Sequence, residues 1–215
     1  MLATSYIGLV FWAHTWWQAL LSGFVLANSI ILVGFCIMHD GGHFAFSDKK
    51  WLNRLAGRGL DLVGGNQTMW TIKHGVLHHT YTNLDAHDDD LETGGVLRLH
   101  PDQPWRPWHR FQHIYAWFSY CLLALIWAGN DIKNLVSGRI KSHKIGAFGA
   151  GNWIIFLTFK ALFFTLGLVL PMMFHAWWAV VLGYVAVLGF VGLVMAIVFQ
   201  LAHVVDHVAF PTPDA

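Results

Sequence analysis

The stretch QALLSGFVLANSIILVGFCIMHDGGH, residues 18–43, joins a long uncharged apolar segment directly to a pair of histidines. A helix needs about 20 predominantly apolar residues to cross the hydrocarbon core of a bilayer. The stretch therefore predicts a membrane helix over residues 18–38 that delivers His39 and His43 to one membrane surface. Histidines four residues apart lie on one helix face and can point at one metal ion. The two intervening glycines weaken the helix, or they let the backbone approach the site.

Two further apolar segments have membrane length. They cover residues 153–174 and 177–199, and they predict a helical hairpin. The chain is 56% hydrophobic and only 12% charged, whereas soluble domains carry roughly 25% charged residues. The expected fold class is an all-α integral membrane protein, in which transmembrane helices carry a cytoplasmic cap of histidine motifs.

The distribution of positive charge predicts the orientation. Of 13 Lys and Arg residues, 12 lie between Lys49 and Lys144, and positive residues in short loops mark the cytoplasmic side. We therefore expect a multi-pass protein with a cytoplasmic region over about residues 39–150 and an active site on the cytoplasmic face. The apolar stretch 115–128 is too short to span, so it is expected to be interfacial or re-entrant, which keeps all histidine groups on one face. No basic tract indicates nucleic acid binding.

Two more histidine groups follow the first. HGVLHH contains His74, His78 and His79, and QLAHVVDH, at the end of the last apolar segment, contains His203 and His207. His74 and His78 repeat the four-residue spacing. His79 lies about 100° round the helix, where it can reach a second metal. The five imidazoles of HDGGH and HGVLHH exceed what one tetrahedral zinc ion requires. Nitrogen ligands in this number favour two iron ions.

Four segments carry a family resemblance: MHDGGHFAFS, LDLVGGNQTMWTIKHGVLHHTYTN, DDDLETGGVLRL and FQLAHVVDHVAFP. They resemble the membrane fatty acid desaturase family, most closely its bacterial front-end or linoleoyl-CoA-desaturase-like branch. The resemblance covers nearly the whole chain and implies a non-haem di-iron site. By this resemblance, the metal ligands and catalytic residues are His39, His43, His74, His78, His79 and His203.

One family motif does not occur in the sequence. The family carries a third histidine motif beyond the last hairpin, a Gln or His followed by two adjacent histidines. No adjacent histidine pair follows His79 before Ala215, and residues 5–13 look like the end of an earlier helix. We therefore expect residues 1–215 to be a single desaturase domain truncated at both ends, and to be catalytically inactive on their own.

The resemblance implies an enzyme, an O2-dependent fatty acyl desaturase that inserts a double bond into an acyl-CoA or an acyl-lipid. Its cofactors are expected to be two non-haem Fe ions, with O2 as co-substrate. Its expected partners are membrane lipid and an external electron donor of the ferredoxin or cytochrome b5 type. Two alternatives stay open: a hydroxylase, ketolase or alkane monooxygenase of the same superfamily, or a non-catalytic membrane protein that binds metal. The TYTN and HVVDH flanks favour the desaturase.

Polar neighbours of the histidines are candidates for holding the ligand rings, because ligand histidines usually donate their other N–H to a carboxylate or carbonyl. These candidates are Asp40, Asn83, Asp88, Asp89, Asp90 and Gln200. A solvated loop explains the three consecutive aspartates equally well, and a structural amide at the helix end explains Gln200 equally well. His207 stands one turn beyond His203 and is a candidate adventitious ligand.

Overall fold

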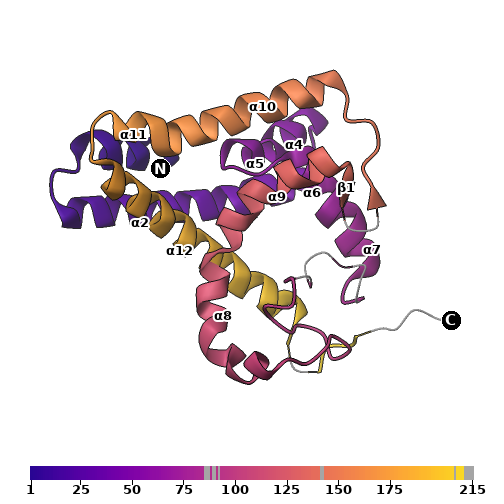
Figure 1. Cartoon of the computed structure of the whole chain (residues 1–215). Helices are drawn as coiled ribbons and strands as arrows, with labels where there is room; N and C mark the ends of the chain where they lie inside the picture. Colours follow the sequence, from indigo (N-terminus) through magenta and orange to yellow (C-terminus); the bar gives the residue numbers. More distant parts are fainter. Residues whose placement is uncertain (85–87, 89–90, 92, 141–142, 206, 211–215) are drawn as a thin grey trace.

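The computed structural model describes residues 1–84, 88, 91, 93–140, 143–205 and 207–210 (Figure 1). In chain order, its helical segments are α1 (Leu2–Ile7), η1 (Gly8–Trp12), α2 (Trp16–Leu32), η2 (Val33–Met38), α3 (His39–Gly42), α4 (Lys50–Gly57), α5 (Gly59–Leu62), α6 (Gln67–Trp70), η3 (Thr71–His78), α7 (His79–Tyr81), η5 (Pro107–Phe111), α8 (Gln112–Cys121), α9 (Leu123–Ser137), α10 (Ala150–Phe164), η6 (Thr165–Val169), α11 (Leu170–Met172) and α12 (Trp177–His203). Within the described residues, the only sheet is an antiparallel hairpin of β1 (Arg139–Ile140) and β2 (His143–Lys144). The predicted all-α fold is confirmed.

Three helical runs are long and apolar enough to cross a membrane, as the composition predicted. They cover Trp16–Gly42, Ala150–Met172 and Trp177–His203. All three expected helices are therefore present, but the first and third continue past their predicted ends into the histidine motifs, as far as Gly42 and His203. Their ends were predicted from hydropathy, whereas a helix ends where its backbone hydrogen bonds end.

The apolar stretch 115–128 is not one short helix. It is divided between α8 and α9, which are bent by 64° relative to each other. Both helices pack against α12. Beside the bend, a Cβ on Gly192 would lie 2.8 Å from the carbonyl oxygen of Tyr120. Glycine permits this close approach, so the bend is anchored on α12.

The segments between the membrane helices form a cap with its own apolar core. A buried cluster consists of Met69, Leu77, Leu135, Ile140 and Phe156. These residues join α6 and η3 to α9, β1 and the first half of α10. Burying each large apolar side chain contributes about 1.5–3 kcal/mol, so the histidine-bearing η3 is held firmly against a membrane helix.

A buried lysine ties the cap to α10. Nζ of Lys160 donates to the carbonyl oxygens of Gly64 and Ala128, and it lies 3.7 Å from Oδ2 of Asp131. A buried ammonium group is tolerated only when it is paired and hydrogen-bonded. This contact therefore fixes the loop before α6, the middle of α9 and the middle of α10 relative to one another.

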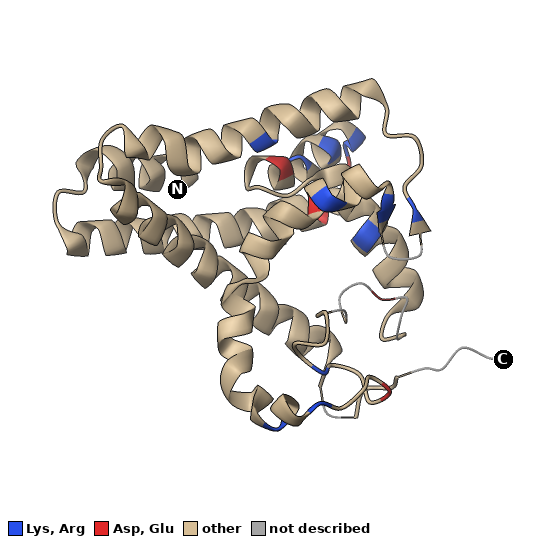
Figure 2. Ribbon diagram, viewed as in Figure 1, with Lys and Arg blue, Asp and Glu red and all other residues tan. Residues whose placement is uncertain are grey.

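Charged residues gather on the cap, as Figure 2 shows. Residues 1–38 and 161–205 contain no Lys, Arg, Asp or Glu. The ends of the membrane helices near α11 are therefore uncharged, while the opposite end of the bundle carries the charge. The histidine motifs lie at the charged end.

Candidate metal centre

The HDGGH motif begins where the first membrane helix enters the cap. Helix α3 continues η2, so that the rings of His39 and His43 lie one turn apart with centroids separated by 4.6 Å. A Cβ on Gly41 would lie 2.6 Å from the backbone of α4, and a Cβ on Gly42 would lie 2.3 Å from the ring of Trp70. The glycines therefore let α3 pack tightly against α4 and Trp70.

The HGVLHH motif lies on η3 and the turn that follows. Asn66 caps the start of this region, where its side chain accepts the backbone N–H of Met69 at 3.0 Å. The segment η3 is π-helical, a rare conformation that is frequent at functional sites. On it, His74 faces the HDGGH histidines, whereas His78 faces His203 at the end of α12.

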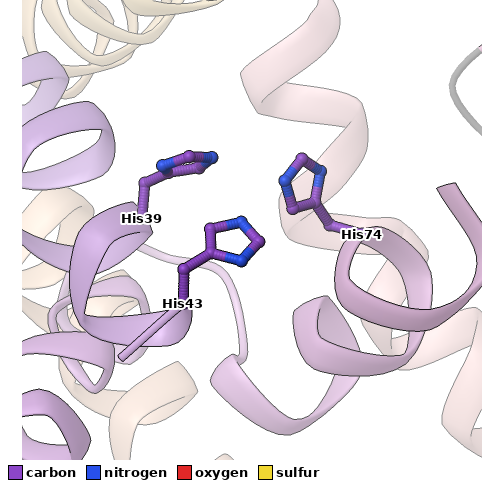
Figure 3. A group of neighbouring side chains, drawn as sticks. All are labelled: His39, His43 and His74. Atoms are coloured by element: carbon purple, nitrogen blue, oxygen red, sulfur yellow. The ribbon is translucent and has the colours of Figure 1, made fainter. Parts of the chain in front are cut away.

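His39, His43 and His74 form a compact group of nitrogen donors (Figure 3). One ring nitrogen of each lies within 4.8 Å of the other two. Metal–imidazole bonds of about 2.0–2.1 Å place the ligand atoms of one tetrahedral ion about 3.4 Å apart, so a small inward movement of these side chains would complete a site. We call these three residues the histidine triad; their side chains can share one metal ion.

Two neighbours flank the histidine triad. The ring of His79 lies 4.9 Å from that of His43 and 4.7 Å from that of His74. Trp70 stacks on His74 at 4.6 Å and also contacts His39 and His43. Trp70 therefore forms a wall of this site, which the histidine motifs alone did not predict. Its position four residues before His74 was the available signal, because such residues share a helix face.

His78 and His203 form a second donor group. Their Nε2 atoms lie 3.2 Å apart, although 125 residues separate them in sequence. Nδ1 of His78 lies 3.0 Å from Oδ1 of Asp88, and both of these side chains are 1% exposed. An ionised carboxylate only accepts hydrogen bonds, so His78 carries its proton on Nδ1 and directs the lone pair of Nε2 toward His203. The buried aspartate thus fixes the tautomer of a potential metal ligand.

Asn83 links this group to the end of α12. Its backbone N–H donates to Oδ2 of Asp88 at 2.9 Å, and its side-chain amide donates to the carbonyl oxygen of His203 at 3.1 Å. Asn83 has a φ of 59°, in the left-handed region that asparagine adopts more readily than most residues. Two of the predicted supporting residues, Asn83 and Asp88, therefore hold His78 and His203 together.

Two other predicted neighbours lie close to the histidines without such bonds to them. Oδ1 of Asp40 lies 3.5 Å from Nδ1 of His39, at a more exposed edge of the site. Gln200 lies on α12 one turn before His203, and its carbonyl oxygen accepts the N–H of Val204. A role for either residue at a metal remains a prediction.

The helical pairing predicted for His203 and His207 is wrong. Helix α12 ends at His203, and His207 has a φ of 64°. The spacing rule for a helix therefore does not apply to this pair. Asp89 and Asp90, two of the candidate carboxylates, lie outside the described residues.

The donors suit a metal ion. Nε2 of His74 is buried and has no hydrogen-bond partner, a state that typically costs about 1–3 kcal/mol. Burial, followed by repulsion from the neighbouring rings, lowers the pKa of His74 to about 3. Burial also lowers the pKa of His43 and of His79. Neutral imidazole is the form that binds metals, so these rings offer lone pairs at neutral pH.

The low pKa of His74 makes the stability of the metal-free protein depend on pH. In the unfolded chain, the imidazole of His74 binds a proton below about pH 6.5. In the folded protein, the same imidazole stays neutral down to a pH of about 3. This contribution to stability is complete above pH 6.5 and is lost as the pH falls. We expect the free energy of unfolding to fall by about 1.4 kcal/mol per pH unit for this one proton. Denaturation of metal-free protein at pH 7.5, 5.5 and 4.5, compared with His74→Phe, measures it; equal pH slopes for the two proteins would refute the assignment.

Removing the carboxylate that holds His78 should weaken metal binding. Asp88→Ala leaves the imidazole free to rotate and to exchange tautomers, and loss of such a partner typically costs about 10–100-fold in metal affinity. Titration with Co(II) against a competing chelator measures the change. Asp40→Ala is the matched control, because its carboxylate is more exposed and lies farther from its histidine. Equal losses of Co(II) affinity in Asp88→Ala and Asp40→Ala would show that Asp88 does not position a metal ligand.

Comparison with known proteins connects this geometry to a family. The fatty acid desaturase family model matches residues 14–214. The chain is 34% identical to an sn-1 linoleoyl-lipid 6-desaturase of Arthrospira platensis, over 96% of this chain and 56% of the relative. It is 32% identical to the Synechocystis protein of the same name, over 91% of this chain and 55% of that one. It is 36% identical to an acyl-lipid (8-3)-desaturase of Physcomitrium patens, over 91% and 41% of the two chains.

The matched range, residues 14–214, contains every histidine of the two donor groups. The chain spans about half the length of the curated relatives it matches. No solved structure matches it. The family model nevertheless covers nearly the whole chain, and the resemblance noted in the histidine motifs is confirmed: this chain belongs to the fatty acid desaturase family.

Proposed function

We propose that this chain forms the catalytic core of an O2-dependent fatty acyl desaturase, which inserts a double bond into an acyl chain. The observation that carries the proposal is the convergence of six histidines at one end of an apolar helical bundle. They come from the end of the first span, from η3 and α7, and from the end of α12. The names of the relatives, which are lipid desaturases, support the same reaction.

Two iron ions are the proposed cofactors. The histidine triad would hold one ion, His78 and His203 would hold the other, and His79 lies beside both groups. Bound iron would use O2 and electrons from a ferredoxin or cytochrome b5 type donor to attack an unactivated C–H bond, which no acid or base can do. The chain supplies neutral imidazoles, the tautomer fixed by Asp88 and the rigid wall formed by Trp70. Such positioning matters because a misplacement of about 1 Å can cost 100-fold in rate.

We infer a multi-pass arrangement with the histidines on the cytoplasmic face. Because His39 lies beside His74 and His78 lies beside His203, the first span and α12 must end on the same side of the membrane. The short connection between α11 and α12 then requires α10 to begin on that side as well. The bent pair α8 and α9 must therefore return to the side from which it started. The concentration of Lys and Arg on the cap supports assigning that side to the cytoplasm (Figure 2).

The proposed substrate is an acyl-lipid, as the names of the relatives suggest. An apolar cavity of about 740 Å³ between α1, α2, η6 and α12 supports a lipid ligand, since ligand pockets have volumes of about 300–1,000 Å³. Phe163 is among the residues that line it. None of the six histidines lines this cavity, so the reacting methylenes would lie outside it and nearer the cap.

The test compares residues 1–215 with an extended chain, in which these residues replace the matched part of the Arthrospira relative. Both are supplied with a ferredoxin system and isotope-labelled acyl lipids. We expect the extended chain to give unsaturated product and to hold two irons, and residues 1–215 alone to give no product. A hydroxylated product would favour the hydroxylase alternative. One zinc ion and no oxygen consumption would overturn the proposal in favour of a non-catalytic metal-binding protein.

A further inference from the structure

Helix α4 and the loop before it carry an exposed surface of apolar and basic residues. Phe44 is 55% exposed and Phe46 is 46% exposed, while Trp51 and Leu55 are 60% and 64% exposed. We call these four residues the α4 surface. Soluble proteins seldom expose large apolar side chains side by side, and such patches mark sites of contact with proteins or membranes.

Helix α4 is amphipathic in a specific sense. Trp51 and Leu55 lie one turn apart on one face. The cations Lys50 and Arg54, each one residue earlier, lie along one flank of that face. The opposite face, which includes Asn53, is buried against the end of the first span. Apolar and aromatic residues flanked by Lys and Arg are typical of a helix that lies in a membrane interface.

The loop before α4 belongs to the same surface. Oδ1 of Asn53 accepts the backbone N–H of Ser47 at 2.8 Å, and its side-chain amide donates to the carbonyl oxygens of Phe44 and Ser47 at 3.3 Å and 2.6 Å. This buried asparagine, 2% exposed, therefore ties the loop to α4. Phe44, the residue directly after His43, is therefore tied to α4.

The elements on both sides of α4 place it at the depth of the membrane boundary. The 27-residue span before it, Trp16–Gly42, is about 40 Å long, so its end lies close to the edge of a hydrocarbon core of about 30 Å. The carbonyl oxygen of Gly64, two residues after α5, accepts Nζ of Lys160. Lys160 lies about 15 Å along the α10 span from Ala150. Helix α5 itself packs against α10 (Figure 1).

We propose that the α4 surface is inserted in the interface of the lipid bilayer, and that acyl lipids reach the histidines laterally across it. The second half of this statement rests on the proposed desaturase function. Phe44, Phe46, Trp51 and Leu55 contact acyl chains, while Lys50 and Arg54 meet anionic headgroups. His43, the exposed member of the histidine triad, directly precedes this surface. The open edge of the metal centre therefore faces lipid that already resides in the membrane.

Site-directed spin labelling tests the insertion directly. In a background of Cys36→Ala and Cys121→Ala, single substitutions Trp51→Cys and Leu55→Cys carry a nitroxide in vesicles that contain only this protein and lipid. Leu20→Cys, on an exposed position of the first span, is the lipid reference, and Lys144→Cys, on the exposed hairpin, is the water reference. We expect labels at 51 and 55 to collide with O2 more than with a water-soluble nickel chelate, as at position 20. A preference for the nickel chelate at either position overturns the proposal and indicates a surface for a protein partner.

The access route has a separate test. In the extended chain, the double variant Trp51→Glu and Leu55→Glu should lower the desaturation of vesicle-resident acyl lipid at least about tenfold at unchanged iron content, because a charged side chain is disfavoured among acyl chains. Val136→Glu, at an exposed apolar position of α9, is the matched control and should keep its activity. Equal rates for the double variant and the control would overturn lateral access. The spin-label result does not depend on turnover, so failure of the desaturase assignment would leave it readable.

Discussion

His43→Ala is expected to abolish metal binding at the histidine triad while leaving the fold intact. His43 supplies one of three nitrogens that lie within 4.8 Å of one another, yet its side chain is exposed. Exposed substitutions usually change stability by less than about 0.5 kcal/mol. Losing a ligand should cost more than the 10–100-fold in affinity that follows loss of a ligand's hydrogen-bond partner. The variant therefore separates metal binding from folding more cleanly than substitution of a buried histidine.

Co(II) titration and thermal unfolding of the same samples measure the two effects. His14→Ala is the matched control, because His14 is also exposed but lies at the opposite end of the first span. We expect the control to bind Co(II) like the unmodified chain. In the extended chain, His43→Ala should also abolish desaturation. Metal affinity within threefold of the control would show that the histidine triad is not the site.

Gly42→Ala should distort the arrangement of the histidine triad by displacing Trp70 or α3. The added Cβ would lie 2.3 Å from the ring of Trp70, a separation that real side chains do not adopt. Either Trp70 or α3 must move, and such overpacking typically costs about 1–3 kcal/mol. Because Trp70 stacks on His74 and contacts His39 and His43, the movement is transmitted to all three ligands. We expect a lower melting temperature and a Co(II) affinity that is at least about tenfold weaker.

Gly34→Ala is the control within the same span. Nothing lies within 4 Å of a Cβ added there, and alanine favours a helix over glycine by about 1 kcal/mol. Its stability should therefore be unchanged or slightly higher, with normal metal binding. If Gly42→Ala bound Co(II) as tightly as Gly34→Ala, the contact with Trp70 would not control the geometry of the centre.

The sequence by itself determined the membrane class, because the length of an apolar run and the placement of charge are local properties. It also placed HDGGH at the end of the first membrane helix, because the apolar run stops there. Spacing was not sufficient to identify a ligand. His109 and His113 have the same separation, yet the ring of His109 accepts the backbone N–H of Arg106 and contacts the carbonyl oxygen of Gly95.

Only the tertiary structure decided which histidines lie together. His78 meets His203 across 125 residues of sequence, and Asp88 is the aspartate that holds His78. Trp70 became part of the centre because Gly42 leaves room for its ring. None of these contacts follows from composition or periodicity, since each depends on how α12, the cap and the first span pack against one another. The sequence specifies donors of the right chemistry, but packing across distant segments sets the distances at which they can share a metal.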